Sequence, residues 1–320
     1  MKKLVALILV LAMALSVVSA LAETTEKKTV AYAIPGLLAA IWSAAADGFT
    51  NQAEEYGWEA IIIDPNDNLE NQITMIQNQI TKGVDALAIT SIDGESTGSL
   101  MAECAKAGIP VFAIDRTVTG ESATTIEADN FLIGQEMAKM YLEQLGDNEG
   151  KVLFVGGPLN NSPTVARIEG FSSVVEPLDN VTIVGSSNTE FDTELALANI
   201  MNYLQANPDI NCIYTCTDTL LPAIITALEE SEMLFNIGEE GHVFVGSVDG
   251  DPYGIQMVLE GKCDACYNLD PYEWAAVAVR SMNDYFNGNE VPASQLVPGS
   301  ILTIDTYEEL KDAGKLWGEG

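Results

Sequence analysis

Short runs rich in β-branched residues alternate with amphipathic helical patterns along most of the chain. The segment 68–82 shows the helical pattern clearly, with Leu69, Ile73, Ile76 and Ile80 at the i, i+4, i+7, i+11 spacing of one buried helical face. The segment 59–64 shows the other pattern, a short isoleucine-rich run typical of a buried strand. The chain therefore reads as a long series of strand and helix pairs.

The helical patterns end repeatedly at a glycine, the residue that most often terminates a helix. Gly57, Gly83 and Gly108 each follow a predicted helix directly. We expect strands at 29–34, 59–64, 86–90, 110–114, 123–127, 151–156, 181–186, 211–215, 243–248, 264–268 and 300–304. We expect helices at 40–56, 68–82, 95–107, 130–145, 164–176, 192–206, 220–230, 252–260, 272–286 and 307–312.

This alternation predicts an α/β fold with parallel sheets covered by helices on both faces. The strands are too many for one sheet of ordinary width, and the rhythm starts again after residue 127, so we predict two doubly wound lobes. No long linker separates them. Ligands of such sheets bind at the carboxyl ends of the strands, and residues directly after strands are therefore the candidates for a site.

The first 22 residues are predicted to be a secretory signal peptide. Lys2 and Lys3 precede the unbroken apolar run 4–18, and Ala20 and Ala22 occupy the positions that a signal peptidase reads, so cleavage before Glu23 is expected. A membrane anchor is the alternative, but the run is shorter than the roughly 20 residues of a span. No cysteine lies near the cleavage site for a lipid anchor. The sequence predicts an exported protein, periplasmic or extracellular.

Acidic residues greatly outnumber basic ones, with 47 Asp and Glu against 14 Lys and Arg and a net charge of −33. Without Lys2 and Lys3 the balance becomes 12 minus 47, or −35. Such a surface repels phosphate backbones, so we expect no nucleic-acid partner. It also favours a soluble monomer, although the acidity can equally reflect the habitat of the host.

Several reaction classes lack their motifs. There is no Gly-rich dinucleotide fingerprint after a strand, no P-loop and no nucleophile elbow, so no cofactor is predicted. The chain has one histidine, His242, which leaves little room for a triad with a histidine base. Asp115 and Asp249 each follow a strand and leave open a carboxylate-dependent glycoside hydrolase.

The five cysteines include one C-x-x-C pair, Cys263 and Cys266. That spacing occurs in zinc and redox sites, but a zinc site needs a second pair or nearby histidines. The sequence favours thiols in or near the core and no metal, with a disulfide between Cys263 and Cys266 as the alternative.

Polar and aromatic side chains follow several predicted strands or begin predicted helices. A carboxylate accepts hydrogen bonds from two adjacent hydroxyls, a guanidinium group donates in a planar fork, and an aromatic ring covers an apolar ligand face. The candidates share one predicted rim and are Trp42, Asp115, Arg116, Arg167, Phe191, Asp249 and Asn268. Singly, each can be explained as an ion pair or a core residue.

The same residues, taken in order, resemble the ribose-type periplasmic binding proteins, the type I substrate-binding components of ABC sugar importers. The matching motifs span the mature chain and are Asp115-Arg116, Ala128-Asp129-Asn130, Arg167-x-x-Gly170-Phe171, Phe191-Asp192, Thr217-Asp218, Val248-Asp249-Gly250 and Asn268. This resemblance implies two lobes with three crossings at a hinge, residues 28–129 plus 269–298 forming one and 130–268 plus 299–320 the other. Asp129-Asn130 and Asn268-Leu269 would lie near the crossings.

The resemblance further implies a sugar held between the lobes. Asp115 and Arg116 would bind its hydroxyls and Trp42 would stack on it, with the other ligand residues supplied by the second lobe: Arg167, Phe191, Thr217, Asp249 and Asn268. The first loop, 38–42, lacks the amide and second aromatic residue that ribose binders carry, and Thr217 replaces an amide. These departures favour another pentose, a furanose or a polyol.

Delivery to an ABC permease is therefore the predicted function, without catalysis. A sensory binding protein that presents its ligand to a membrane receptor is the alternative that the sequence does not separate from it. The related repressors begin with a DNA-binding headpiece, whereas this chain begins with a predicted signal peptide.

Overall fold

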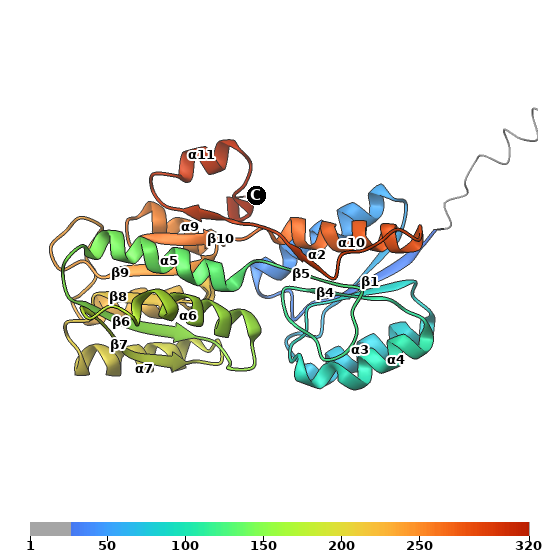
Figure 1. Ribbon diagram of the computed structural model, residues 1–320, viewed down its shortest axis with the longest axis horizontal. Coiled ribbons are helices and arrows are strands. Elements are labelled where there is room, and N and C mark those ends of the chain that lie inside the picture. The colour runs from blue at the N-terminus through green and yellow to red at the C-terminus, as the bar shows by residue number, and fades with distance from the viewer. Residues whose placement is uncertain (1–26, 320) are drawn as a thin grey trace, which may run out of the picture.

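The computed structural model describes residues 27–319, which form two α/β lobes side by side (Figure 1). The predicted signal peptide therefore lies outside the described residues. Each lobe is built on a six-stranded sheet with helices on both faces, so the predicted fold class is confirmed. No helix among residues 27–319 has the length and apolar character needed to cross a membrane.

The first sheet has the strand order β11-β5-β4-β3-β1-β2, and all its neighbours pair in parallel. Helices α2 and α10 pack together on one face, and α3 and α4 lie on the other (Figure 1). The strands are β1 (Thr29–Ala33), β2 (Glu59–Ile63), β3 (Ala86–Ile89), β4 (Val111–Ile114), β5 (Thr124–Glu127) and β11 (Ser294–Leu296). The helices are α2 (Ala40–Glu55), α3 (Leu69–Lys82), η1 (Glu95–Thr97), α4 (Gly98–Ala107) and α10 (Pro271–Phe286).

The second sheet has the order β12-β10-β9-β8-β6-β7, and β12 alone runs antiparallel to its neighbour. Its strands are β6 (Gly150–Gly156), β7 (Val181–Asn188), β8 (Cys212–Thr215), β9 (Phe244–Asp249), β10 (Ala265–Asn268) and β12 (Ser300–Leu302). The helices are α5 (Asn130–Leu145), α6 (Ser162–Val175), α7 (Thr193–Ala206), η2 (Asp218–Leu220), α8 (Leu221–Glu230), α9 (Pro252–Leu259), α11 (Tyr307–Asp312) and η3 (Trp317–Glu319).

The chain passes between the sheets three times. β5 of the first sheet leads into α5, β10 of the second leads into α10, and β11 of the first leads into β12 of the second. The boundaries of the two lobes given above remain a prediction, and these changes of sheet support them. Buried apolar residues continue through the crossings, including Ala128, Leu269 and Val297, so one hydrophobic cluster joins both lobes.

The predicted apolar stripe of α3 differs in detail from the observed buried face. Ile76 is fully buried, whereas Leu69, Ile73 and Ile80 are only partly buried. Gln72 is buried instead, because its amide donates to the carbonyls of Ile34 and Thr90 and accepts from the Ile92 N–H. A polar residue of this helix therefore fixes the loops that follow two strands.

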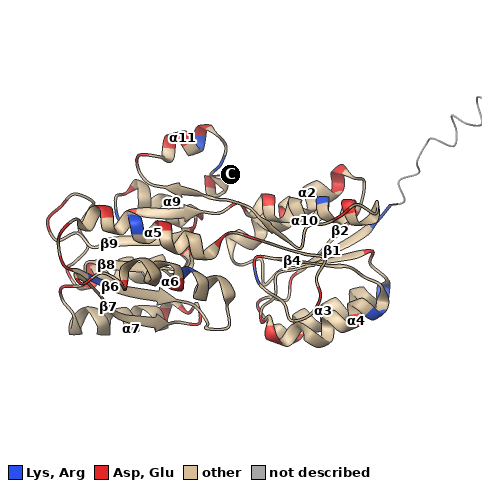
Figure 2. Cartoon of the chain, in the orientation of Figure 1, with Lys and Arg blue, Asp and Glu red and all other residues tan. Residues whose placement is uncertain are grey.

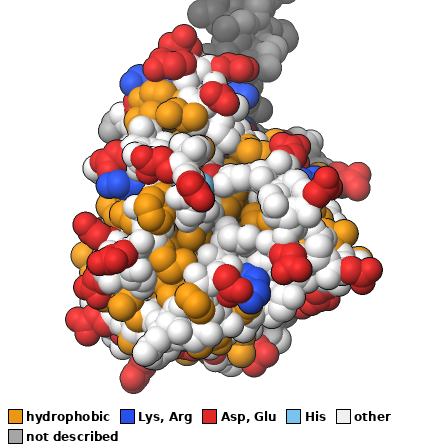
Figure 3. All heavy atoms as spheres, turned by 90° about the vertical axis from the view of Figure 1, so that its left-hand side faces the viewer, with side chains coloured by type: hydrophobic (Ala, Val, Ile, Leu, Met, Phe, Trp, Pro, Cys, Tyr) orange, Lys and Arg blue, Asp and Glu red, His pale blue; other side chains and the backbone are white. Residues whose placement is uncertain are grey.

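Asp and Glu positions are spread along both lobes, and Lys and Arg positions are sparse (Figure 2). The end face of the second lobe shows the same imbalance, with Asp and Glu spread over it (Figure 3). The sequence-derived expectation of a strongly negative surface therefore applies to both halves of the fold.

Candidate functional site

A cavity of about 550 Å³ lies between the lobes, at the carboxyl ends of strands from both sheets. Seven of the eight predicted ligand residues line it. They come from both lobes and are Trp42, Asp115, Arg116, Arg167, Phe191, Thr217 and Asp249. The structure thus brings together side chains that are separated by up to 207 positions (249 − 42) in the sequence.

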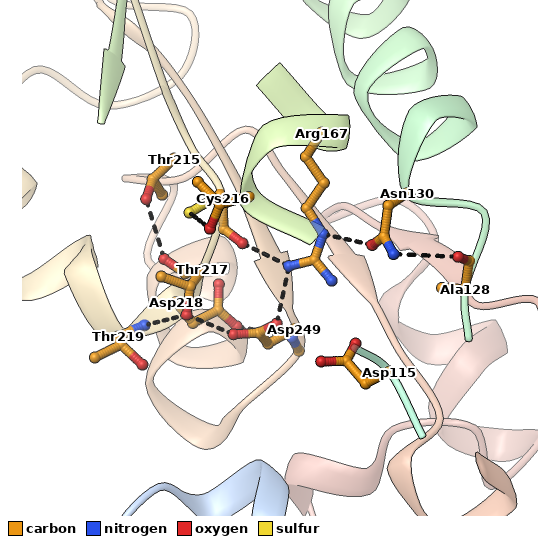
Figure 4. Close-up of polar contacts among 12 residues, drawn as sticks. Asp115, Ala128, Asn130, Arg167, Thr215, Cys216, Thr217, Asp218, Thr219 and Asp249 are labelled. Carbon is orange, nitrogen blue, oxygen red and sulfur yellow. Dashed lines mark hydrogen bonds and ion pairs between the residues drawn. The ribbon is translucent and has the colours of Figure 1, made fainter. Parts of the chain in front are cut away.

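Arg167 is the centre of a hydrogen-bond network in the second lobe (Figure 4). Its Nε donates to Asn130 Oδ1 at 2.8 Å, and one Nη donates to the Cys216 carbonyl at 2.6 Å. The same Nη lies 3.5 Å from Asp249 Oδ1. Arg167 is only 5% exposed, and these contacts fix the plane of its guanidinium group at the cavity wall.

Asp249 ends β9 and is held from a second side by Thr217, whose hydroxyl donates to Asp249 Oδ2 at 2.6 Å. Burial raises the pKa of Asp249 to about 7, against the lowering effects of Arg167 and of the Thr217 hydrogen bond. This carboxyl group therefore changes charge near neutral pH.

Asp218 supports the turn that carries Asp249. Its Oδ2 accepts the backbone N–H groups of Gly250 and Asp251 at 2.7 and 2.9 Å. Burial raises the pKa of Asp218 well above its ordinary value, and the carboxylates of Asp251 and Asp249 raise it further. The turn is thus fixed by a buried acidic side chain that does not itself line the cavity.

Asp115 and Arg116 follow β4 and form the first-lobe side of the cavity. Arg116 Nη1 donates to the Ser91 carbonyl at 3.0 Å, and its guanidinium carbon lies 5.3 Å from the centroid of the Trp42 ring. Asp115 is 5% exposed, and its carboxylate accepts no hydrogen bond from the described residues, although the Arg116 Nε lies 3.7 Å away as an ion-pair partner. Burial raises the pKa of Asp115, although Arg116 and Arg167 lower it. Its oxygens are available to a ligand.

The backbone is unusual at the cavity. Seven non-glycine residues of the described chain have a positive φ, and five of them line this site: Asn66, Asp67, Asp115, Phe191 and Asp249. Such conformations are unfavourable for residues with a Cβ and persist where the surroundings hold them. Their concentration here is typical of a functional site.

The two aromatic candidates are supported differently. Trp42 packs beside the Arg116 guanidinium group, as described above. The Phe191 ring lies over Gly157, where an added Cβ would come within 2.1 Å of Phe191 Cε1. Gly157 therefore makes room for the ring at the cavity wall.

Asn268 is the predicted ligand residue that the structure does not place among the cavity residues. Its Nδ2 donates to the Lys315 carbonyl at 2.9 Å, and its neighbour Leu269 lines the cavity instead. The C-terminal segment covers this end of β10 and accepts from the Asn268 Nδ2, whereas the Asn268 Oδ1 is buried without a hydrogen-bond partner among the described residues. A ligand role for Asn268 stays a prediction.

Sequence reasoning also missed polar residues that line the cavity. Asn66 and Asp67 could have been found from the sequence, because they follow β2 as Asp115 follows β4. The other residues lie in loops or at helix starts with no distinctive pattern. The missed residues are Asn66, Asp67, Asn161, Thr164, Thr219 and Asp251.

All five cysteines are buried free thiols, as the sequence favoured, and the alternative disulfide between Cys263 and Cys266 is not formed. Within residues 27–319, no cluster of His, Cys, Asp and Glu has an arrangement suited to a metal ion. His242 is used structurally: its Nε2 lies 2.9 Å from Asp264 Oδ1 and its Nδ1 lies 2.7 Å from the Phe235 carbonyl.

A family model described as a periplasmic binding protein domain matches residues 30–290, which is most of the chain. This protein belongs to that family. The ribose import binding protein RbsB of Escherichia coli is 26% identical over 294 residues, covering 92% of this chain and 95% of the relative. The galactofuranose-binding protein YtfQ of the same bacterium is 24% identical over 286 residues, covering 87% and 88%.

Solved structures agree with this membership. A galactofuranose binding protein superposes with a TM-score of 0.81 at 23% identity, covering 90% of this chain and 99% of the other, and supports the fold. An ABC transporter solute binding protein from Actinobacillus succinogenes, solved with bound D-allose, gives a TM-score of 0.80 at 25% identity, covering 88% and 100%.

Proposed function

We propose that the protein is a solute-binding protein that captures a neutral monosaccharide between its lobes and delivers it to an ABC permease. The observation that carries this proposal is the convergence of two Asp residues and one Arg from each lobe on a cavity flanked by aromatic rings. Adjacent hydroxyls suit carboxylates and guanidinium forks, and the C–H face of a sugar suits an aromatic ring.

The charges around the cavity indicate the class of ligand. Four carboxylates line it, from Asp67, Asp115, Asp249 and Asp251, against the guanidinium groups of Arg116 and Arg167. Once these carboxylates are ionised, a sugar acid or a sugar phosphate would meet an excess of negative charge, whereas the hydroxyls of a neutral sugar can donate to these groups. A neutral ligand therefore fits best.

Among neutral sugars, the relatives and the first loop favour a pentose, a furanose or a related polyol. Ribose, galactofuranose, D-apiose and D-allose appear in the names of similar proteins. The loop beside Trp42 supplies apolar side chains and no amide, and Thr217 stands where ribose binders carry an amide. For these reasons we do not propose D-ribose as the preferred ligand.

Binding is proposed to occur by hinge closure. The lobes already touch beside the cavity, where the Thr117 N–H lies 3.3 Å from Ser162 Oγ. A ligand that bridges Asp115 of one lobe and Arg167 of the other contacts both only when the lobes are close, so it stabilises the closed form. The permease would then recognise that form.

Export and a monomeric state complete the proposal. The basic start, apolar run and small residues of 1–22 support a cleaved signal peptide without a lipobox cysteine, and thus a periplasmic or extracellular location. A sensory role with a membrane receptor remains the second candidate, because it uses the same cavity. The glycoside hydrolase is not favoured, since the relatives are named for binding and import.

Titration calorimetry of the purified chain with pentoses, hexoses, sugar alcohols and hexuronates tests the proposal. Heat is expected from at least one neutral sugar and not from the hexuronates. Folded protein that binds none of the neutral sugars would contradict it. A transport assay with the permease encoded nearby separates import from sensing.

A further inference from the structure

The C-terminal segment after β12 packs behind the turn that carries Asp249. In Figure 1 it forms the α11 region at the top of the second lobe, and the chain end lies beside α9 and β10. Tyr307, Leu310 and Leu316 are buried in the second-lobe hydrophobic cluster, which anchors the segment. The last short helix, η3, is thereby held against the Asp249 turn.

Two contacts join this segment to the turn, and a third joins it to Asn268, which pairs with Asp249 at the end of the neighbouring strand β10. Trp317 Nε1 donates to the Asp249 carbonyl at 2.8 Å. A Cβ on Gly318 would come within 2.6 Å of the Gly250 carbonyl, so the two backbones approach as closely as glycine permits. Asn268 Nδ2 donates to the Lys315 carbonyl at 2.9 Å. The indole N–H is the contact that reaches Asp249 itself.

The turn needs such support because its backbone is unfavourable. Asp249 has a φ of 127°, and Gly250 has a φ of 82°. A Cβ on Gly250 would lie 2.3 Å from Asn268 Oδ1, so this residue has no room for a side chain. Backbone conformations of this kind persist only where neighbouring groups hold them.

We infer that Trp317 is a positioning residue for ligand binding, which fixes the backbone of Asp249 through its indole N–H. The inference rests on the proposed function of Asp249. Trp317 does not line the ligand cavity. It borders a second cavity on the other side, together with Tyr272 and Gly48 of the first-lobe helices. Its effect on a ligand is therefore exerted through Asp249.

Trp317→Phe removes the N–H and keeps an aromatic ring, and Trp274→Phe is the matched control. Trp274 is fully buried and its Nε1 has no hydrogen-bond acceptor among the described residues. Loss of one hydrogen bond that holds a binding group is expected to weaken the Kd of Trp317→Phe for the best sugar of the panel about five- to tenfold. Trp274→Phe should lower the melting temperature and leave the Kd within twofold of the parent.

Amide hydrogen exchange in the ligand-free protein supplies a readout that does not depend on any sugar. The N–H groups of Gly250 and Asp251 donate to Asp218 and report on the turn directly. They should exchange faster in Trp317→Phe and at the parental rate in Trp274→Phe. If no sugar binds the parent chain, the proposed function fails, and this measurement alone decides whether Trp317 holds the turn.

Several results would overturn the inference: an unchanged Kd in Trp317→Phe, an equal loss in both variants, or a loss of affinity with unchanged exchange at Gly250 and Asp251. If Trp317→Phe does not fold, a benzothienyl-alanine at position 317 decides the matter, because sulfur replaces the N–H while the bicyclic shape remains. Weaker binding with parental melting temperature in that protein supports the positioning role, and parental binding refutes it.

Discussion

The two sides of the cleft carry the same charged groups but hold them differently. In the second lobe, Arg167 is bonded to Asn130 and to the Cys216 carbonyl, and Asp249 accepts from Thr217. In the first lobe, Asp115 has only a 3.7 Å approach of the Arg116 Nε. Both aspartates directly follow or end a central strand, β4 or β9, so the difference does not come from their place in the sheet.

The comparison shows that a ligand-binding side chain can also stabilise the fold through its own hydrogen bonds, or can lack such bonds and contribute to binding alone. The second-lobe groups satisfy one another before a ligand arrives, and their removal leaves buried polar partners. The oxygens of the Asp115 carboxylate accept no hydrogen bond from the described side chains, and the burial of this charge is unfavourable in the absence of ligand. Substitutions in the second lobe should therefore change stability and affinity together, and those in the first lobe should change affinity alone.

The largest effect is expected for Asp249→Ala. It removes a ligand acceptor and leaves the buried Arg167 and the Thr217 hydroxyl without this partner, so affinity should fall about 100-fold or more and the free energy of unfolding by about 2 kcal/mol. Calorimetry and urea denaturation measure the two effects.

The control for Asp249→Ala is Asp209→Ala in the same lobe, which breaks an exposed ion pair with Lys151 and should leave the free energy of unfolding nearly unchanged. Equal destabilisation by the two variants would contradict the view that the second-lobe groups form a buried network.

A smaller effect is expected for Asp115→Asn. Affinity should fall about 10- to 100-fold, because a charged acceptor becomes a neutral amide, whereas the free energy of unfolding should stay the same or rise. The reason is that only the Arg116 Nε approaches the Asp115 carboxylate, at 3.7 Å, so the substitution breaks no short hydrogen bond and removes an unfavourable buried charge. A loss of stability as large as that of Asp249→Ala would show that the two sides of the cleft are not different.

Strand ends were the most predictive signal in the sequence. Asp115 follows and Asp249 ends an apolar run typical of a buried strand. Because the strands of each sheet run mainly parallel, both residues lie at the carboxyl-end edge of their sheets. The helix ends were equally readable, since Gly83 and Gly108 adopt the left-handed conformation that ends α3 and α4.

The failures involve contacts that no local pattern encodes. β11 is a three-residue strand with a mostly exposed pattern, and it exists because it pairs with β5 across 169 positions of chain (294 − 125). β12 pairs antiparallel to β10, against the parallel expectation. The contact of Asn268 with the Lys315 carbonyl also depends on tertiary packing, and a ligand role for Asn268 stays a prediction.

The pH dependence of stability tests whether Asp249 of the second lobe carries a raised pKa. The pKa of Asp249 is about 7 in the folded protein and 3.8 ordinarily, so between these values the folded state holds a proton that the unfolded chain has released. Its contribution to stability is present at low pH and is lost as the pH rises through 7. Arg167, Asp251 and Asp115 are the charges that act on it, and Asp218, whose own pKa is raised, interacts with it as well.

Asp249→Asn should make the slope of unfolding free energy less negative by up to about 1.4 kcal/mol per pH unit between pH 5 and 6. His242 must be separated from this effect. Burial lowers the pKa of His242, but Asp264 and the Phe235 carbonyl outweigh this effect, so the net pKa is raised above its ordinary value. The stabilising contribution of His242 is therefore also lost at higher pH. Measuring the variant in a His242→Gln background removes that contribution, and an unchanged slope there would refute the assignment to Asp249.

The smallest effect is expected for Gly157→Ala, which tests whether the second-lobe aromatic ring depends on packing. The new methyl group would overlap the Phe191 ring, so the ring must turn away from its place at the cavity wall. Affinity should fall about threefold to tenfold, with a change in unfolding free energy of about 1 kcal/mol or less. Gly98→Ala is the control, because the nearest atom there would be at 3.5 Å, an ordinary contact. Parental affinity in Gly157→Ala would mean that Phe191 does not contact the ligand, and that Trp42, beside Arg116, is the aromatic residue on which the sugar stacks.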